Sequence, residues 1–523
     1  MKASQGIEIE KKYDVGNDAT VPALEQLPGV ARVGTPHIAV LEAVYFDTDR
    51  HTLANRRITL RRRTGGIDAG WHLKLPPEAQ TGSGTEPQQR RELHAPLGQP
   101  VVVPDSLLAH VQAYLRGTEV APVVRLQTRR TTHPLYGEDG IHLADLADDE
   151  VEATRLHHEP AEEQPQRWRE WELELVDGGP DLFGPAEQLL AAAGARPAGH
   201  ASKLARALGS VASGSGEQEA ESPAALLAGK KAPAAAVVTV YVAEQLRQLF
   251  AGDAAVRLEE PEAVHDMRSA TRRIRSVLAA YRKLYRAVPV RRLRDELGWL
   301  GHLLGEPRDA EVLLGRLRGH LDELPPGEGT DAAREQVERK AGAAFDAGYR
   351  RLQAALQSER YFRLLDDLED FCRQPPVLAQ AVAPGRTIAA KAVEKSARRL
   401  RRSHKAAAHA RRGTAHENAL HQVRKDAKRL RHVAESAGLV RGKRARKVAK
   451  AAHRQQRILG DFHDAVVARN LLQSLEAGHK LPETTAEALA ALRGRQAELM
   501  DAAGAKYRKA RKKSRGLLKP RVV

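Results

Sequence analysis

An internal repeat constrains the fold of this chain more than any other feature of its sequence. Residues 264–275 (VHDMRSATRRIR) match residues 420–431 (LHQVRKDAKRLR), and residues 304–310 (LGEPRDA) match residues 459–465 (LGDFHDA). The two matches lie 156 and 155 residues apart, so both elements recur in the same order at nearly one offset. The surrounding sequence is rich in Ala, Leu, Arg and Glu with helical spacing. We therefore predict a duplicated, all-helical unit.

The N-terminal part of the chain has a different pattern, in which apolar and charged residues alternate with a period of two. The alternation runs through residues 7–13, 58–63, 71–75 and 171–175, with Gly-containing turn signals between these segments. This period is typical of β-strands. A Gly/Ser/Glu-rich run at residues 209–223 then separates the strands from the helices, and its composition predicts a flexible linker.

These patterns predict two domains in 523 residues. We expect a strand domain over residues 1–208 and a helical domain over residues 224–518, with repeat halves at about 224–375 and 385–518.

The charge divides near the same boundary. Residues 1–210 hold 23 Lys and Arg against 30 Asp and Glu, whereas the rest of the chain holds 61 against 37. A strongly basic half indicates a polyanionic partner. Aromatic residues make up only 4% of the chain, which is little for stacking bases, so we do not expect nucleic acid to be that partner.

The chain has features of a cytoplasmic protein. Cys372 is the only cysteine, which excludes disulfides and cysteine-ligated zinc within the chain. No window approaches the roughly 20 apolar residues that cross a bilayer, and the N-terminus lacks the apolar core of a signal peptide. We therefore expect a cytoplasmic protein with no membrane partner.

The alternation places charged side chains of both signs on one face of the sheet. Such a face either meets solvent, with the apolar face (Ile7, Ile9, Leu60, Leu73 and Leu173) supplying the core, or it lines a polar cavity in a closed barrel. The pattern alone leaves both alternatives open. The charged face carries Glu8, Glu10, Lys12, Arg61, Arg63, Glu170, Glu172 and Glu174.

A series of short motifs favours the barrel. In order they are EIEKK at 8–12, YFDT at 45–48, LRRR at 60–63, LKLP at 73–76, RE at 91–92, RR at 129–130, WREWELEL at 168–175 and SKL at 202–204. Each is weak alone, but the ordered set resembles the CYTH superfamily of triphosphate tunnel metalloenzymes. The resemblance implies an antiparallel barrel whose lumen binds triphosphate together with Mg²⁺ or Mn²⁺.

Such a lumen divides its charges between two tasks. Cations would cradle the triphosphate, and carboxylates would hold the metal. Glu8, Glu10 and Lys12 are the candidate catalytic residues. The same charges could instead form cross-strand ion pairs, and the acid expected after Gly140 is either Asp145 or Asp148, which point to opposite faces of a strand. The candidate triphosphate ligands are Lys12, Arg61, Arg63, Lys74, Arg129 and Lys203, and the candidate metal ligands are Glu8, Glu10, Asp148, Glu170, Glu172 and Glu174.

The repeat carries a basic stripe in each half. His265, Arg268 and Arg272 are spaced i, i+3 and i+7, so they share one helix face. Like charges on one face repel each other, and a bound polyanion would compensate for that repulsion. Pairing with Asp309 and Asp464 is the alternative. Metal ligation by the histidines is a less favoured one, because adjacent arginines would repel a cation.

The stripes resemble the CHAD domain, the conserved histidine α-helical domain, over residues 224–518. The hallmark H-x-x-R-x-x-x-[RK]-[RK] occurs twice, as does an LG-x-x-[RH]-D motif that we expect to form a turn. The resemblance implies two pseudo-symmetric helical bundles around a basic channel that binds inorganic polyphosphate. Its candidate ligands are His265, Arg268, Arg272, Arg273, Arg308, His421, Arg424, Lys428, Arg429 and Arg431.

Together these features predict an α+β multidomain protein: a barrel enzyme that hydrolyses triphosphate with a divalent metal, joined to a polyphosphate-binding helical domain. The alternative is a protein without turnover, whose helical domain directs it to polyphosphate granules while the barrel only senses a phosphate ligand. The sequence predicts no oligomeric state.

Overall fold

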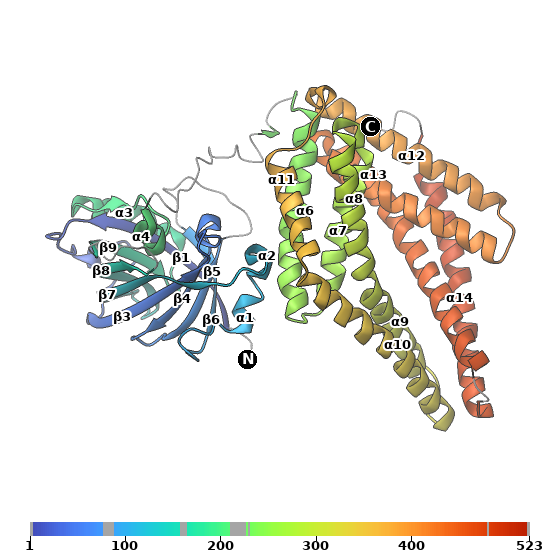
Figure 1. Ribbon diagram of the computed structural model, residues 1–523, viewed down its shortest axis with the longest axis horizontal. Coiled ribbons are helices and arrows are strands. Elements are labelled where there is room, and N and C mark those ends of the chain that lie inside the picture. Colours follow the sequence, from blue (N-terminus) through green and yellow to red (C-terminus); the bar gives the residue numbers. More distant parts are fainter. Residues whose placement is uncertain are drawn as a thin grey trace. The chain divides into compact units, whose positions relative to one another are not determined.

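The computed structural model describes residues 4–76, 88–156, 165–209, 226–227, 231–478 and 481–519. The chain forms two compact units, residues 1–218 and 219–523 (Figure 1). Residues 210–223 of the expected linker lie outside the described residues, so the linker and the domain limits drawn from it stay predictions.

The first unit is built on antiparallel strands, most of which are long (Figure 1). Its strands are β1 (Ser4–Val15), β2 (Arg32–Val33), β3 (His37–Asp47), β4 (Thr59–Thr64), β5 (Gly70–Leu75), β6 (Gln88–Ala95), β7 (Ala121–Tyr136), β8 (His142–Arg155), β9 (Gln166–Leu175) and β10 (Arg196–Pro197). Its helices are α1 (Asp105–Leu108), α2 (Gln112–Leu115), α3 (Phe183–Ala192) and α4 (Lys203–Leu208), with short 3-10 turns η1 (Leu24–Gln26), η2 (Ala54–Arg56) and η3 (Pro180–Leu182).

Eight of these strands close into a barrel. Their order is β1-β6-β5-β4-β3-β7-β8-β9, and β9 pairs back with β1, so that Lys12 stands opposite Glu172. The two short strands lie off this ring, where β2 pairs with β7 and β10 with β1. Closure satisfies the backbone hydrogen bonds of both edges of the sheet. The predicted antiparallel barrel is confirmed.

Two apolar cores lie on the outside of the barrel. In one, Trp71 and Leu73 of β5 pack against Leu107 and Val111 in the α1–α2 segment. In the other, residues of β1 and β9 pack beneath Phe183 and Leu190 of α3. The apolar face of the alternating strands therefore faces outward beneath helices, which leaves the charged face to line the interior. Ile7 is an exception, since it is 67% exposed.

A third apolar cluster fills one end of the barrel. Leu204 and Leu208 of α4 pack against Leu126, Val151 and Trp168. These three strand positions share the side of the strand that carries Arg130, Asp149 and Glu170, so they point inward. Helix α4 therefore plugs the barrel and brings Lys203, its first residue, into the interior.

The second unit is helical, as predicted (Figure 1). Its helices are α6 (Ala234–Arg257), α7 (Ala263–Ala280), α8 (Ala287–Leu303), α9 (Gly305–Asp322), α10 (Glu328–Leu356), α11 (Glu359–Arg373), α12 (Gly385–His409), α13 (Thr414–Gly478) and α14 (Glu483–Ser514), with short turns η5 (Arg282–Leu284) and η6 (Ala379–Val382).

The repeat is visible in this helix order, although some elements differ. The break between α7 and α8 corresponds to a kink in α13 at Gly442, whose φ of 53° is left-handed. The expected LG-x-x-[RH]-D turn is wrong: residues 305–310 are helical, and residues 459–465 lie within α13. Leu304 also has right-handed helical angles. The chain therefore follows a helical path through the motif and does not reverse its direction there.

The two halves meet along α7 and the first part of α13. His432 Nδ1 lies 3.0 Å from Ser276 Oγ, and Tyr281 Oη lies 3.4 Å from Ser436 Oγ. Residue numbers increase in the same direction along both helices, so the helices run parallel. Within the part of the chain that the structure describes, no helix has the length and apolarity needed to cross a membrane.

Candidate functional sites

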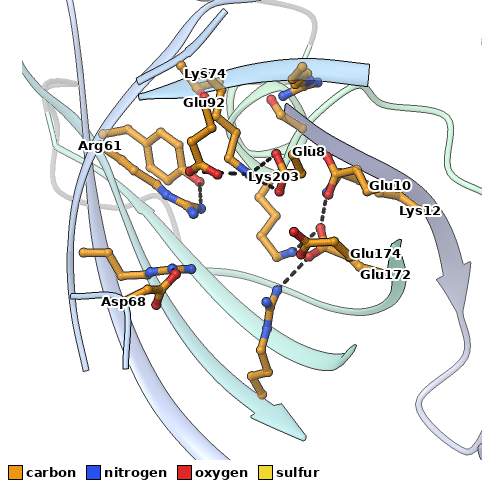
Figure 2. A pocket seen from close by; sticks show the side chains of 16 residues that line it. Glu8, Glu10, Lys12, Arg61, Asp68, Lys74, Glu92, Glu172, Glu174 and Lys203 are labelled. Carbon is orange, nitrogen blue, oxygen red and sulfur yellow. Dashed lines mark hydrogen bonds and ion pairs between the residues drawn. The ribbon is translucent and has the colours of Figure 1, made fainter. Parts of the chain in front are cut away.

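Figure 2 shows a cavity inside the barrel into which side chains of both charges point. Seven of its lining residues are Lys or Arg and six are Asp or Glu. The charged face of the strands therefore encloses a polar interior, and the expectation that it could meet bulk solvent is wrong. The lining consists of Glu8, Glu10, Lys12, Tyr45, Thr59, Arg61, Arg63, Asp68, Lys74, Arg90, Glu92, Arg130, Glu172, Glu174, Ser202 and Lys203.

Lys12 joins two carboxylates on neighbouring strands. Its Nζ donates to Glu10 Oε2 at 2.7 Å and also to Glu172 Oε1. Burial disfavours the charged ammonium group, but Glu10 and Glu172 outweigh that effect and raise the pKa of Lys12. Lys12 is therefore a fixed positive charge on the cavity wall.

Lys74 is a second lysine of the cavity wall, and it pairs with the carboxylate of Glu8. Its Nζ lies 2.5 and 2.6 Å from the two carboxylate oxygens of Glu8. Glu92, the residue opposite Lys74 on β6, lies 3.9 Å from Lys74 Nζ and accepts from His72 at 2.9 Å. Burial would raise the pKa of Glu92, but its hydrogen bond to His72 and the charges of Lys74 and Arg61 lower it. Cross-strand ion pairs, the alternative drawn from sequence, thus do occur in the cavity.

Three arginines gather on another part of the cavity wall. Arg61 donates to Tyr45 Oη at 3.4 Å, and Arg63 pairs with Asp68. Burial lowers the pKa of Arg63 to about 9, and the charges of Arg61 and Arg130 add to the shift. An arginine with a depressed pKa among other arginines marks a place where an anion would be stabilised.

The plug helix brings Lys203 to a buried acidic triad. Lys203 Nζ lies 2.8 Å from Asp149, 2.8 Å from Glu170 and 2.7 Å from Glu172. Arg130 adds contacts of 2.6 Å to Asp149 and to Glu172. Carboxylate oxygens of the triad lie within 4.8 Å of one another, so the triad could hold a metal ion. Lys203 already neutralises part of its charge.

Glu174 has less compensation than the other carboxylates. Burial raises its pKa to about 7, and the charges of Glu8, Glu10 and Glu172 add to the rise while Lys74 opposes it. Among the described residues, it forms no hydrogen bond or ion pair. Oxygen donors with surplus negative charge are what a hard divalent cation takes as ligands, so Glu8, Glu10, Glu172 and Glu174 fit a metal by donor type.

The structure corrects two predicted site residues. Asp148 points away from the cavity and pairs with Arg169 at 2.7 and 2.8 Å. Arg129 is 52% exposed and lies 3.4 Å from Glu150. Their neighbours Asp149 and Arg130 take the interior positions, because successive side chains of a strand alternate between its faces.

Of the two acids considered after Gly140, Asp145 is the one on the inward side, which it shares with Asp149, and it stands opposite Glu174. It contacts His142 at 2.8 Å and, like Asp149, is not among the residues that line the cavity. Glu170 also lies beside the cavity rather than on its wall. The cross-strand register that pairs Asp149 with Glu170 would have identified Asp149; the adjacent acids by themselves do not show which one faces inward.

In the helical unit, the two basic stripes meet at the interface between the halves. Arg268 and Arg272 of α7 act electrostatically on Arg424 and Lys428 of α13. Each residue of α7 stands 156 positions before its counterpart. We call these four residues the central cluster. The two stripes therefore lie together, and like charges this close favour an anion between them.

The central cluster shows its mutual repulsion in its pKa values. Burial lowers the pKa of Lys428 to about 6, and Arg272, Arg424 and Arg268 lower it further. Burial and the Arg268 charge also lower the pKa of Arg272, to about 10. Within the described residues, neither Arg272 nor Lys428 forms an ion pair with a carboxylate. The cluster is thus undercompensated.

Acidic partners compensate part of the stripes. Asp309 accepts from both terminal nitrogens of Arg268, at 2.8 and 3.1 Å, yet its own side chain is 70% exposed. The negative charge of Asp464 favours the charged form of Arg424 and so offsets part of the cost of burying it. The intramolecular pairing considered from sequence therefore occurs beside the surplus positive charge.

The first glycine of the repeated LG pair makes room for a stripe arginine. A Cβ on Gly305 would lie 3.1 Å from Arg268 Nη2, which is a tight contact, whereas one on Gly460 would lie 3.8 Å from Arg424 Nε, which is an ordinary one. Packing against the arginine therefore gives a physical reason for glycine in the first motif only.

The stripe histidines are neutral at pH 7. Burial and Arg308 lower the pKa of His265, and burial followed by His463 lowers that of His421 to about 4. The rings of His421 and His463 are 4.2 Å apart. Arg308 is held by Glu262 and Glu311, at 3.0 and 2.8 Å.

The other predicted basic ligands have acidic neighbours of their own. Arg273 and Arg431 share Glu435, at 3.7 and 2.7 Å. Arg429 lies 3.4 Å from Asp426. These three arginines are less available to a polyanion than the central cluster.

Comparison with protein families identifies both units. The CYTH domain family matches residues 6–207, and the CHAD domain family matches residues 240–473. An uncharacterised protein of Mycobacterium tuberculosis, Rv2226, is 40% identical over 502 residues, which are 92% of each chain.

Two solved structures resemble part of the chain. PptA from Streptomyces chartreusis is 20% identical with a TM-score of 0.45, over 53% of this chain and 99% of that one. The CHAD domain from the plant Ricinus communis is 27% identical with a TM-score of 0.42, over 53% of this chain and 93% of that one.

Proposed function

The chain belongs to the CYTH–CHAD family, and we propose that its barrel hydrolyses triphosphate with a divalent metal while its helical unit binds inorganic polyphosphate. A CYTH barrel with a charged interior and a CHAD unit with a basic interface are the two features on which this proposal is built.

One observation carries the enzymatic part: besides its ion pairs, the cavity holds incompletely compensated charge of both signs. Arginines crowd one another around Arg63, whereas carboxylates crowd one another around Glu174. The first group suits phosphate oxygens, and the second suits a divalent cation. A metal–triphosphate complex needs both kinds of site side by side in one enclosed space.

The residues then have separate tasks. Arg61, Arg63 and Arg130 bind phosphate oxygens, and Lys12 holds positive charge on the cavity wall. Glu8, Glu10, Glu172 and Glu174 would hold the metal, and Mg²⁺ and Mn²⁺ are the ions this oxygen set suits. A bound ion would neutralise charge on the phosphates and lower the pKa of a bound water. Positioning and charge neutralisation supply most of the catalysis in phosphoryl transfer.

Phosphate release from tripolyphosphate tests this directly. Wild-type protein with Mg²⁺ or Mn²⁺ should release phosphate, and Glu8→Ala should not. Asp148→Asn is the matched control, because it removes an acid of the same sheet that points outward. Equal activity in all three proteins would contradict the proposal.

A protein without turnover is the second candidate. The ion pairs of Lys74 with Glu8 and of Lys12 with Glu10 favour it, because they neutralise carboxylates that a metal would need. Calorimetry distinguishes the two functions: tripolyphosphate would bind to the barrel with the same affinity in the presence and absence of metal, and no phosphate would be released.

The central cluster supports polyphosphate as the ligand of the helical unit. Four basic residues from two helices act on one another, and two of them, Arg272 and Lys428, have no carboxylate partner among the described residues; such a group suits an anion with several charges. Calorimetric titration with long-chain polyphosphate tests this, with duplex and single-stranded nucleic acid as competitors. Stronger binding of nucleic acid would contradict the proposal.

A further inference from the structure

A second cavity lies in the helical unit, between α12 and the C-terminal part of α14. Its volume is about 500 Å³, a size typical of sites for small ligands. None of its lining residues belongs to the central cluster. The lining consists of Arg401, His404, Arg508, Arg511, Lys512, Arg515 and Leu518, and we call it the α12–α14 pocket.

The α12–α14 pocket is entirely cationic in its charged groups. Five of its seven lining residues are Lys or Arg, and none is Asp or Glu. Arg401 donates to the backbone carbonyl of Leu518. Across the residues that the structure describes, none of the five cations forms an ion pair with a carboxylate. Their mutual repulsion is therefore left to solvent or to a bound anion.

The helix dipole explains only part of this arrangement. Cations in the last turn of a helix are stabilised by its carbonyl end, which applies to Arg511 and Lys512 at the end of α14. Arg508 lies nearly two turns before that end, and Arg401 belongs to the interior of α12. Arg508, Lys512 and Arg515 are exposed, so water screens part of their charge. The dipole does not account for five cations from two helices around one cavity.

A buried polar chain fixes the pocket wall. His404 Nε2 lies 2.8 Å from Gln455 Oε1, and Gln455 Nε2 donates to Ser514 Oγ at 2.7 Å. His404, Gln455 and Ser514 are all buried, and they join α12, α13 and α14. The cations therefore project from a preorganised wall, which reduces the entropic cost of binding a ligand.

The pocket does not follow from the duplication. The position 156 residues before Arg401 holds Gln245. The positions 155 residues before the four α14 cations, which follow the second repeated element, hold Gln353, Leu356, Gln357 and Arg360. Four of the five pocket cations thus have a neutral residue at the equivalent position of the first half. The central cluster, by contrast, has a basic residue in both halves. The two sets of cations therefore answer to different requirements.

We infer that the α12–α14 pocket is a second phosphate site, which takes a short run of phosphate groups. Several Arg and Lys around a small cavity match a ligand with several negative charges in a small volume, and arginine grips phosphate oxygens bidentately. The ligand is either a free short polyphosphate or one end of a long chain. This site extends the phosphate binding proposed above, but its residues are shared with neither the barrel nor the central cluster.

Site-resolved footprinting of the full chain tests the inference. An arginine-selective dicarbonyl reagent, read by mass spectrometry, should label Arg508 and Arg515 at least about tenfold more slowly when phosphate ligand is bound. The protection should persist in Arg268→Glu/Arg424→Glu, which disables the central cluster. Protection by tripolyphosphate would identify a free short ligand, and protection by long chains only would identify a chain end. Absence of protection with both ligands, or its loss in the double variant, would overturn the inference.

A charge-matched pair of variants separates a site from general attraction. Arg508→Glu/Arg515→Glu should weaken polyphosphate binding by about tenfold at fixed salt. Lys506→Glu/Lys509→Glu makes the same charge change on α14 at exposed positions outside the pocket, and it should change affinity by less than about twofold. Circular dichroism checks the helix content of both. Equal losses in the two variants would overturn the inference.

Discussion

Ser276 and His432 occupy equivalent positions of the two repeats, and they contact each other: His432 Nδ1 lies 3.0 Å from Ser276 Oγ. Two equivalent residues meet only near the axis that relates the halves. One turn earlier on each helix stand Arg272 and Lys428. The duplication therefore brings like charges together along the interface of the halves, and the consequences of that can be measured.

The first prediction concerns the pH dependence of stability and of polyphosphate binding. The pKa of Lys428 falls from 10.5 to about 6 in the folded protein, so between these values the unfolded chain binds more protons and the unfolding free energy rises with pH. A polyanion would favour the ammonium form. Polyphosphate binding should therefore take up a proton above pH 6 and weaken by up to about tenfold per pH unit toward pH 8. Calorimetry in buffers of different ionisation enthalpy measures this uptake.

Lys428→Arg is the control for that measurement, because arginine stays charged at these pH values. Its polyphosphate affinity should vary less between pH 6 and 8 than that of the wild type. Equal proton uptake in the two proteins would show that another group is titrating.

The second concerns the metal site. Glu10→Gln preserves the shape of a side chain that is only 3% exposed but removes its charge. Metal ions supply several kcal/mol to such reactions, so kcat for tripolyphosphate should fall by at least about a hundredfold. Phosphate release measures this, and an unchanged Tm would show that the fold is intact. Unchanged turnover would remove the barrel enzyme from consideration.

The third prediction compares the stability of variants at two adjacent arginines. Arg130 bridges the buried acids Asp149 and Glu172, so Arg130→Ala should cost about 3–5 kcal/mol of unfolding free energy. Among the described residues, exposed Arg129 pairs with Glu150 alone, at 3.4 Å, and Arg129→Ala should change stability by less than about 0.5 kcal/mol. Urea unfolding of both variants measures the difference. The reverse order would mean that β7 has the opposite register.

Much of this fold could be predicted from the sequence. The alternation of apolar and charged residues in the strands and the internal repeat of the helices each extend over many residues, so no single position decides them. Closure into a barrel was implied by the resemblance, and the structure shows the physical reason: apolar residues such as Leu73 and Leu173 pack outward beneath helices. The apolar plug could not be predicted, because Leu204 and Leu208 match any amphipathic helix.

Single site residues were harder to assign where two like residues are adjacent. Arg129–Arg130 and Asp148–Asp149 each offer one inward and one outward charge, and only the cross-strand register decides between them. Asp149 pairs with Glu170, which lies 21 positions later in the chain, on the next strand. Local sequence carries no record of that register.

The fourth prediction is that the two units are separable. Contacts divide the chain into units of residues 1–218 and 219–523, so residues 1–208 and 224–523 should each fold when expressed alone. The first fragment should retain triphosphate hydrolysis, and the second should retain polyphosphate affinity. Calorimetry and phosphate release on both fragments measure this. Loss of both activities on separation would place a shared site between the units.

The last prediction concerns the two stripes acting on one chain of phosphates. Arg268 and Arg424 come from different halves but act electrostatically on each other, so one polyphosphate molecule should contact both. Binding through several cations weakens steeply with salt, and each lost phosphate contact should reduce the salt slope by about one. Charge reversal of either arginine should thus weaken binding and flatten the slope.

Reversal of both arginines should cost far more than either change alone, because a chain held by one half is at high effective concentration for the other. Only attraction by the remaining positive charge and by the α12–α14 pocket should then be left. Titration calorimetry over a salt series decides the outcome, with Lys391→Glu/Lys395→Glu, two exposed positions of α12, as the charge-matched control. If Arg268→Glu/Arg424→Glu binds as the wild type does, the stripes serve the packing of α7 against α13, and the polyphosphate lies on other helices.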